Sequence, residues 1–342
     1  MIKIIFFSDT HLGFDHPIKP KIKRRRRGHD FFANYNRVID YAINVGADAL
    51  IHGGDLFNRS KTHVSIIHKA FDELQRAANN NIPIYIVPGN HERSFIQTGI
   101  FGAHPMIHIF DSPTCFLLNT KNKKILLAGF PFVRKDIRSR FKEMLDQTGW
   151  RSYDADHKFA LVHHCIEGAT VGVQNFTFKY SEDTIRINEI PNEFTALLSG
   201  HIHRPQILEH DLYDKPVNTP AIYPGSIERT SFAEQHETKG FYELVFDEKI
   251  NEWKYNFIDL PARPMHEIKL DTNKIQSEKV IDYLRTEINK LEADSIIRII
   301  PEGENVADIM KLLTAQTLRD ITHNTMNIEL STYIYQRRSS QL

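Results

Sequence analysis

Three apolar stretches near the start of the chain each lead into side chains that commonly bind metal ions. Residues 2–7 precede Asp9 and His11, residues 47–52 precede Asp55, and residues 82–87 precede Asn90-His91-Glu92. β-Branched and aromatic residues dominate residues 2–7, and all three stretches are predicted to form buried strands. Segments with helical spacing, residues 31–45 and 63–80, separate them, so the order indicates a sheet with helical crossovers. Because such sheets place their chemistry at the carboxyl ends of strands, we expect these polar side chains to converge.

The rest of the chain predicts more strands and a second domain. Further strands are expected at 115–118, 124–130, 159–163, 195–199, 221–226 and 240–247, with a helix at 134–145. So many strands after the early crossovers favour an α/β fold in which a sandwich of two sheets is flanked by helices. Pro261 and Pro264 mark a boundary. We therefore expect one domain over residues 1–260 and a small α+β capping domain over residues 261–342, with helices at 277–291 and 306–318.

Composition limits the number of domains, the kind of nucleic-acid contact and the cell compartment that we expect. The 342 residues suit about two domains, and the net charge of zero confines any nucleic-acid contact to a local patch. The two cysteines, Cys115 and Cys165, form no CxxC pair, which favours a reducing compartment. The apolar start is too short for a signal peptide, and no stretch approaches the roughly 20 apolar residues of a membrane helix. We expect a cytoplasmic protein without membrane contact.

The ligand chemistry indicates two metal ions rather than one. His201 and His203 are two residues apart in Gly-His-Ile-His, so their side chains point to opposite sides of an extended chain and can serve adjacent ions. Carboxylates, imidazoles and an amide, without thiolate, suit Mn²⁺, with Fe²⁺ or Zn²⁺ as alternatives. A shared carboxylate, for which we favour Asp55, would hold two ions that clamp a phosphate and activate water. The expected reaction is hydrolysis of a phosphoester.

The motifs D-x-H, G-D, G-N-H-E, a histidine at a strand end and G-H-x-H, in this order, resemble those of the calcineurin-like metallophosphoesterases over residues 1 to about 245. The resemblance implies a four-layer fold with a central β-sandwich. It also implies that one ion is held by Asp9, His11, Asp55 and His203, and the other by Asp55, Asn90, His163 and His201. His91 would then be the catalytic histidine, and Glu92 would orient it. His164 is the alternative to His163.

Further motifs are similar to those of the SbcD-type DNA repair nucleases. These motifs are Ser8–Gly13, Arg27–Phe31, Gly54–Phe57, Tyr223–Phe232 and Lys239–Phe241. The resemblance implies a Mn²⁺-dependent 3′→5′ exonuclease and single-strand endonuclease with a capping domain. It also implies a homodimer that works with an SbcC-type, SMC-like ATPase in the repair of double-strand breaks. Asn58 stands where relatives often carry His or Asp.

A basic run follows the first motif, with seven cations among residues 19–27. We interpret Lys21, Lys23, Arg24, Arg25, Arg26 and Arg27, together with Arg204, as contacts to DNA phosphates. A solvated loop or a targeting signal is the simpler interpretation of such a run. The alternative function, with the same metals, is a phosphoesterase that acts on small nucleotides or phosphoproteins.

Overall fold

The computed structural model describes residues 1–16, 25–92 and 104–331, and these fall into two compact units. The first unit comprises residues 1–14 and 30–261. The second comprises residues 15–29 and 262–342. In this second unit Arg25, in the described part of the basic run, donates its amide to the carbonyl of Asn324 at 3.3 Å, and its own carbonyl accepts from the side chain of Asn327 at 3.1 Å.

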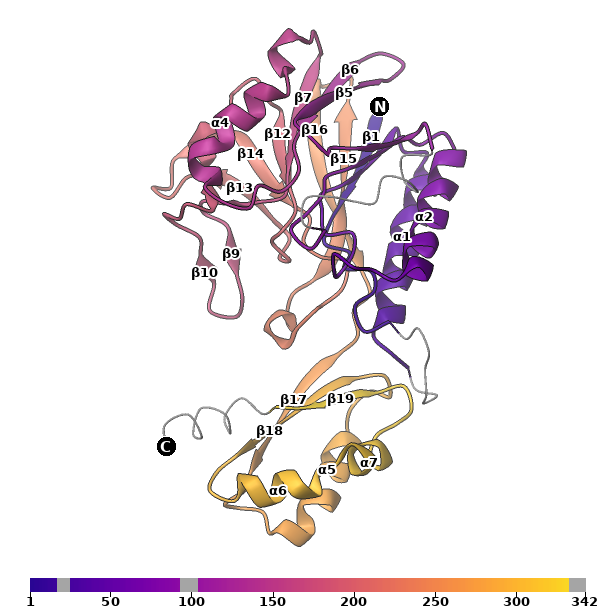
Figure 1. Cartoon of the computed structure of the whole chain (residues 1–342), viewed down its shortest axis with the longest axis vertical. Helices are drawn as coiled ribbons and strands as arrows, with labels where there is room; N and C mark the ends of the chain where they lie inside the picture. Colours follow the sequence, from indigo (N-terminus) through magenta and orange to yellow (C-terminus); the bar gives the residue numbers. More distant parts are fainter. Residues whose placement is uncertain (17–24, 93–103, 332–342) are drawn as a thin grey trace. The chain divides into compact units, whose positions relative to one another are not determined.

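Two six-stranded sheets form the centre of the first unit (Figure 1). The order of one sheet is β16-β15-β1-β2-β3-β4, and the order of the other is β13-β14-β12-β7-β6-β5. The bounds in the first sheet are β1 Ile2–Phe7, β2 Ala49–His52, β3 Ile84–Ile86, β4 Ile107–Ile109, β15 Lys239–Asp247 and β16 Glu252–Leu260. Those in the second are β5 Thr114–Asn119, β6 Lys124–Gly129, β7 His157–Val162, β12 Ala196–Ser199, β13 Gln206–His210 and β14 Pro216–Tyr223. The predicted α/β sandwich is confirmed.

The central strands are apolar because both of their faces are covered. A core that includes Ile4, Phe6 and Phe159 lies between the sheets. Helices α1 (Gly28–Val45) and α2 (Val64–Asn79) cover the outer face of the first sheet, and α4 (Ile137–Gln147) packs against the second. The first unit therefore has the layers helix, sheet, sheet, helix. Shorter strand pairs, β8 Cys165–Ile166 with β11 Thr184–Ile185 and β9 Thr170–Val171 with β10 Phe176–Thr177, extend the loops after β7.

Strand direction determines where the site forms. Strands β1 to β4 run parallel to one another, as do β6, β7, β12 and β14 in the other sheet. A bridge between Ser8 and Ser226 connects the end of β1 to the segment after β14. The carboxyl ends of strands from both sheets consequently meet at one edge of the sandwich.

The second unit contains a three-stranded parallel sheet of β17 (Met265–Asp271), β18 (Ile296–Glu302) and β19 (Asn327–Leu330). Helix α5 (Val280–Ile288) matches the expected helix at its centre. The single helix expected over 306–318 is wrong, because the chain forms α6 (Val306–Leu312) and α7 (Ala315–Asp320). Thr314 starts the second helix as its N-cap, accepting a hydrogen bond from the amide of Thr317.

Candidate metal centre

The predicted ligands all lie just beyond the carboxyl ends of parallel strands. Asp9 and His11 follow β1, Asp55 follows β2 and Asn90 follows β3. His163 directly follows β7, and His201 and His203 follow β12. Asp9, His163 and Asp55 are buried, with at most 2% of their surface exposed. The structure thus brings together side chains that are separated by up to about 190 positions in the sequence.

The backbone at these positions has an uncommon conformation. Ten described non-glycine residues have positive φ, and four of them are candidate ligands: Asp9 (51°), His11 (41°), Asp55 (54°) and His201 (83°). The other six are Asp or Asn, and Asp, Asn and His are the non-glycine residues enriched in this region; both described histidines with positive φ, His11 and His201, are candidate ligands. Each such conformation costs on the order of 1–3 kcal/mol and is typical of functional sites. The fold holds strained turns where the ligands are needed.

One group of ligand atoms contains Asp9, His11 and His203. The Nε2 atoms of His11 and His203 are 3.0 Å apart, and Nε2 of His203 is 3.8 Å from Oδ1 of Asp9. These side chains each offer a ligand atom, and the atoms all lie within 4.8 Å of one another. The Asp9 carboxylate is fixed from behind by the hydroxyl of Ser8 at 2.5 Å and the amide of His201 at 3.1 Å.

A neighbouring group contains Asp55, Asn90, His163 and His201. Oδ1 of Asn90 is 3.1 Å from Nε2 of His163 and 2.8 Å from Nδ1 of His201. Oδ2 of Asp55 lies 3.4 Å from Nε2 of His163. The ligand atoms of Asp9, Asp55 and His163 also lie within 4.8 Å of one another. The same is true of the ligand atoms of His11, Asp55 and His91. Asp55 and Asp9 consequently connect the two groups.

The hydrogen bonds of two histidines show that the residues fit a pair of metal ions. Nδ1 of His163 donates to the carbonyl of Gly53 at 2.8 Å, and Nδ1 of His203 faces Oε1 of Glu234 at 3.1 Å. With the proton on Nδ1, each ring directs the lone pair of Nε2 at the other ligands. A carboxylate or carbonyl behind the ring is the usual arrangement of metal-binding histidines.

His163 and His164 have different surroundings, although both are buried. Nε2 of His164 accepts a hydrogen bond from the amide of Val133 at 3.0 Å, and its ring stacks on Phe132. Its lone pair is therefore occupied by the backbone. Nε2 of His163 faces Asp55 and Asn90, which supports our choice of His163 as the ligand.

His91 is oriented by a group other than the one predicted. Its Nδ1 donates to the carbonyl of Asn58 at 2.7 Å, which leaves Nε2 directed at the site, 3.8 Å from Oδ2 of Asp55. Glu92 was expected to orient His91. Its carboxylate instead accepts hydrogen bonds from the amides of Phe57 at 2.6 Å and Gly89 at 2.9 Å. Glu92 is buried, which raises its pKa to about 8, and it ties the loop after β2 to the loop after β3.

Two glycines allow the close approach of these loops. A Cβ atom on Gly54, whose φ is 110°, would collide with the ring of His163. A Cβ atom on Gly89 would collide with the carboxylate and the amide of Asp55. The glycines in the Gly-Asp and Gly-Asn-His-Glu motifs therefore give Asp55 and His163 room to meet.

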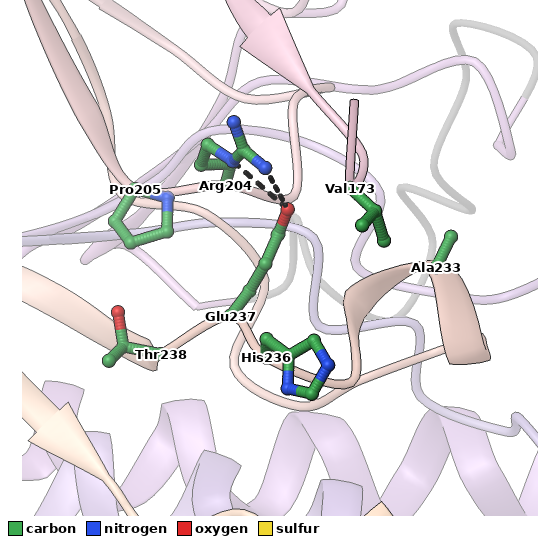
Figure 2. Close-up of a pocket in the computed structure, with 7 residues that line it drawn as sticks. All are labelled: Val173, Arg204, Pro205, Ala233, His236, Glu237 and Thr238. Atoms are coloured by element: carbon green, nitrogen blue, oxygen red, sulfur yellow. Dashed lines mark hydrogen bonds and ion pairs between the residues drawn. The ribbon is translucent and has the colours of Figure 1, made fainter. Parts of the chain in front are cut away.

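Arg204, predicted to contact a DNA phosphate, is committed to the protein itself. Its Nε and Nη2 pair with Oε1 of Glu237 at 3.0 Å, as Figure 2 shows. Its remaining N–H groups donate to Asn175 at 2.7 Å, Thr170 at 3.3 Å and the carbonyl of Gly172 at 2.7 Å. All five N–H groups of the guanidinium thus have acceptors within the protein, so a DNA phosphate would have to replace one of these partners. The pair forms part of the wall of a pocket of about 380 Å³.

The described part of the basic run is also engaged within the second unit. Arg25 pairs with Asp294 at 3.3 Å, and Arg26 pairs with Asp15. Arg27 is 8% exposed, and its amide donates to Asp15 at 3.1 Å. Lys21, Lys23 and Arg24 lie outside the described residues.

Two residues near His203 were not predicted to belong to the site, although one of them, Lys239, opens the Lys239–Phe241 motif. Glu234 contacts the ring of His203, and the buried Lys239 of β15 contacts Glu234 at 2.5 Å. Burial raises the pKa of Glu234. The hydrogen bond from His203 and the charge of Lys239 lower the pKa by more than burial raises it, so the pKa lies below its usual value. Glu234 is 31 positions from His203 and sits in no ligand motif, so no local signal identified it.

Residues 2–205 match the calcineurin-like phosphoesterase family, and the chain belongs to that family. The predicted fold class and the prediction of a metal-dependent phosphoesterase are thereby confirmed, and the family implies two divalent metal ions. Within the described residues, no helix has the length and hydropathy to cross a membrane.

Curated relatives narrow the resemblance further. The DNA double-strand break repair protein Mre11 of Methanococcus maripaludis is 26% identical over 309 residues, covering 86% of this chain and 75% of its own. The protein of the same name from Saccharolobus solfataricus is 25% identical over 319 residues, covering 90% and 76%. That of Archaeoglobus fulgidus is 24% identical and covers 91% and 70%. The predicted likeness to the family of SbcD-type DNA repair nucleases is confirmed.

Proposed function

We propose that this chain is a DNA nuclease that processes the ends of double-strand breaks. The observation that carries the proposal is the convergence of seven candidate ligands from both sheets at one edge. Similarity to proteins named for double-strand break repair over some nine-tenths of the chain supports DNA as the substrate. We further propose Mn²⁺ as the preferred metal, with 3′→5′ exonuclease and single-strand endonuclease activities.

In this proposal, Asp9, His11, Asp55 and His203 hold one ion, and Asp55, Asn90, His163 and His201 hold the other. When bound, the two ions supply a nucleophile at neutral pH and neutralise charge on the phosphate. The Gly53 carbonyl and Glu234 keep the rings of His163 and His203 in the orientation that binding needs. Binding also relieves the mutual repulsion of the buried carboxylates Asp9 and Asp55.

His91 is the residue that we propose to act on the substrate without holding an ion. Its side chain is 37% exposed, whereas His163 has none exposed, so His91 is accessible to a substrate. Because its Nδ1 proton is held by the carbonyl of Asn58, a second proton on Nε2 would face the site. That proton can stabilise the phosphoryl group or pass to the leaving oxygen. Glu92 acts on catalysis indirectly, by fixing the loops that carry Asp55 and Asn90.

We retain the basic run and the second unit as the proposed DNA-contacting parts of the chain. Lys21, Lys23 and Arg24 to Arg27 are the candidate phosphate contacts, and residues 261–342 form the proposed capping domain. Arg25 and Arg26 must exchange their carboxylate partners, Asp294 and Asp15, for phosphate. Binding is then weaker at higher salt concentration.

The partners proposed for the chain follow from the SbcD-type motifs. We propose a homodimer that works with an SMC-like ATPase of the SbcC type in the cytoplasm. Size-exclusion chromatography with light scattering tests the dimer. Co-purification with an ATPase of this class from the source cells tests the second partner.

The engagement of Arg25, Arg26 and Arg204 within the protein favours the alternative substrate class, small nucleotides or phosphoproteins. Labelled single- and double-stranded DNA and a mononucleotide diester, each incubated with Mn²⁺, Mg²⁺ or Zn²⁺, separate the two. We expect Mn²⁺-dependent cleavage of DNA by the wild-type protein and none by Asp55→Asn. Turnover of the small diester without cleavage of DNA would establish the alternative.

A further inference from the structure

Lys239 is a lysine whose side chain has no exposed surface. Its ammonium has three acceptors: Oε2 of Glu234 at 2.5 Å, the hydroxyl of Ser226 at 2.8 Å and the carbonyl of His203 at 3.0 Å. All three N–H donors are therefore used. Burying two charges costs several kcal/mol per ion, so such a pair is a poor device for stability alone. Its location behind a candidate metal ligand suggests another role.

Glu234 is held as firmly as Lys239. One carboxylate oxygen, Oε1, accepts from the hydroxyl of Thr230 at 2.5 Å and from the amide of Thr230 at 3.3 Å. The same oxygen faces Nδ1 of His203 at 3.1 Å. The other oxygen contacts Lys239 and, at 3.3 Å, the hydroxyl of Ser226. The carboxylate therefore has little freedom to rotate away from His203.

We propose that Glu234 and Lys239 are positioning residues for His203, fixing both its ring and its main chain. The inference rests on the proposed function, because it takes His203 as a metal ligand. Lys239 binds the His203 carbonyl directly and holds Glu234, and Glu234 keeps the proton of the imidazole on Nδ1. Nε2 of His203 then presents its lone pair to the ion that it shares with His11 and Asp9.

The two proposed ion sites differ in how they depend on this pair. The ring of His163, at the other ion, is held by the carbonyl of Gly53, a backbone group that a side-chain substitution leaves in place. Neither Glu234 nor Lys239 has a described contact with His163, Asn90 or His201. Removing the carboxylate of Glu234 is therefore expected to weaken one ion site and spare the other.

The test is calorimetric titration of metal-free protein with Mn²⁺. For Glu234→Gln we expect one of the two binding steps to weaken about 10- to 100-fold, the usual effect of losing the partner of a metal-binding histidine, and the other step to stay unchanged. Glu228→Gln is the matched control. Glu228 is also buried in the same segment, but its carboxylate contacts the amides of Arg229 and Asn34 rather than a candidate ligand.

Thermal unfolding of the metal-free proteins shows whether the substitution acts on the fold instead. If Glu234→Gln fails to fold, the double variant Glu234→Gln/Lys239→Met removes both charges together, and the same selective weakening is expected. Equal affinity in variant and wild type, or the same loss in Glu228→Gln, would overturn the inference while leaving the metal centre intact. A wild-type protein that binds no Mn²⁺ would refute the proposed function as well.

Discussion

Replacement of Lys239 by methionine should destabilise the first unit strongly, because it leaves the carboxylate of Glu234 buried without its cation. The lysine side chain is fully buried, and that of Glu234 is 10% exposed. Breaking a buried ion pair by removing one partner costs about 3–5 kcal/mol. For a unit of this size, 1 kcal/mol corresponds to roughly 2–4 °C, so the midpoint of thermal unfolding should fall by about 6–20 °C.

The double variant Glu234→Gln/Lys239→Met separates the charge effect from simple loss of contacts. It removes both charges of the pair, and Glu237, which lies 3.8 Å from Lys239, keeps Arg204 as its cation. Its cost should therefore approach that of the hydrogen bonds lost by Ser226 and His203, about 1–3 kcal/mol. Lys254→Met is the matched control, since Lys254 lies on the neighbouring β16, is half exposed and pairs with Asp247 at 3.7 Å. Thermal unfolding in EDTA measures all three variants. If Lys239→Met were as stable as the double variant, the reasoning would be refuted.

Four further substitutions test the arrangement of the site. His91→Ala should abolish DNA cleavage and leave the Mn²⁺ stoichiometry at the wild-type value, because His91 is proposed to act on the substrate; loss of metal would instead make it a ligand. Gly54→Ala should lower both metal content and activity, since its Cβ atom would displace His163; a fully active variant would contradict the close packing. His163→Ala should lose one of two Mn²⁺ ions by elemental analysis, whereas His164→Ala should retain both and lose stability.

Sequence patterns predicted the strands that carry the ligands because these strands are buried on both faces. Residues 2–7 form an apolar run that only Lys3 interrupts, and β1 has the predicted bounds. Strand β16, at the edge of the sheet, was missed although exposed residues such as Glu252 and Asn256 alternate with partly buried ones, which is the pattern of a half-buried strand. The break between α6 and α7 was missed because the helical periodicity continues through Thr314, where capping decides the boundary.

The same distinction applies to the candidate site. Ligands such as Asp9 and His203 belong to short motifs, so the sequence points to them directly. Groups that orient those ligands are often backbone carbonyls, such as that of Asn58, or distant side chains, such as Glu234. Their role depends on tertiary contacts, and a sequence pattern does not encode those contacts locally. Arg204 is an example of a sequence signal that tertiary contacts alter: it stands beside a ligand motif, but its guanidinium pairs with Glu237 of the same protein.

Anomalous diffraction from crystals soaked in Mn²⁺ tests the central claim most directly. We predict two peaks in each chain, both within coordination distance of Asp55. One peak should also contact Asp9, His11 and His203, and the other should contact Asn90, His163 and His201. A single peak, or peaks that other residues coordinate, would contradict the two-metal centre.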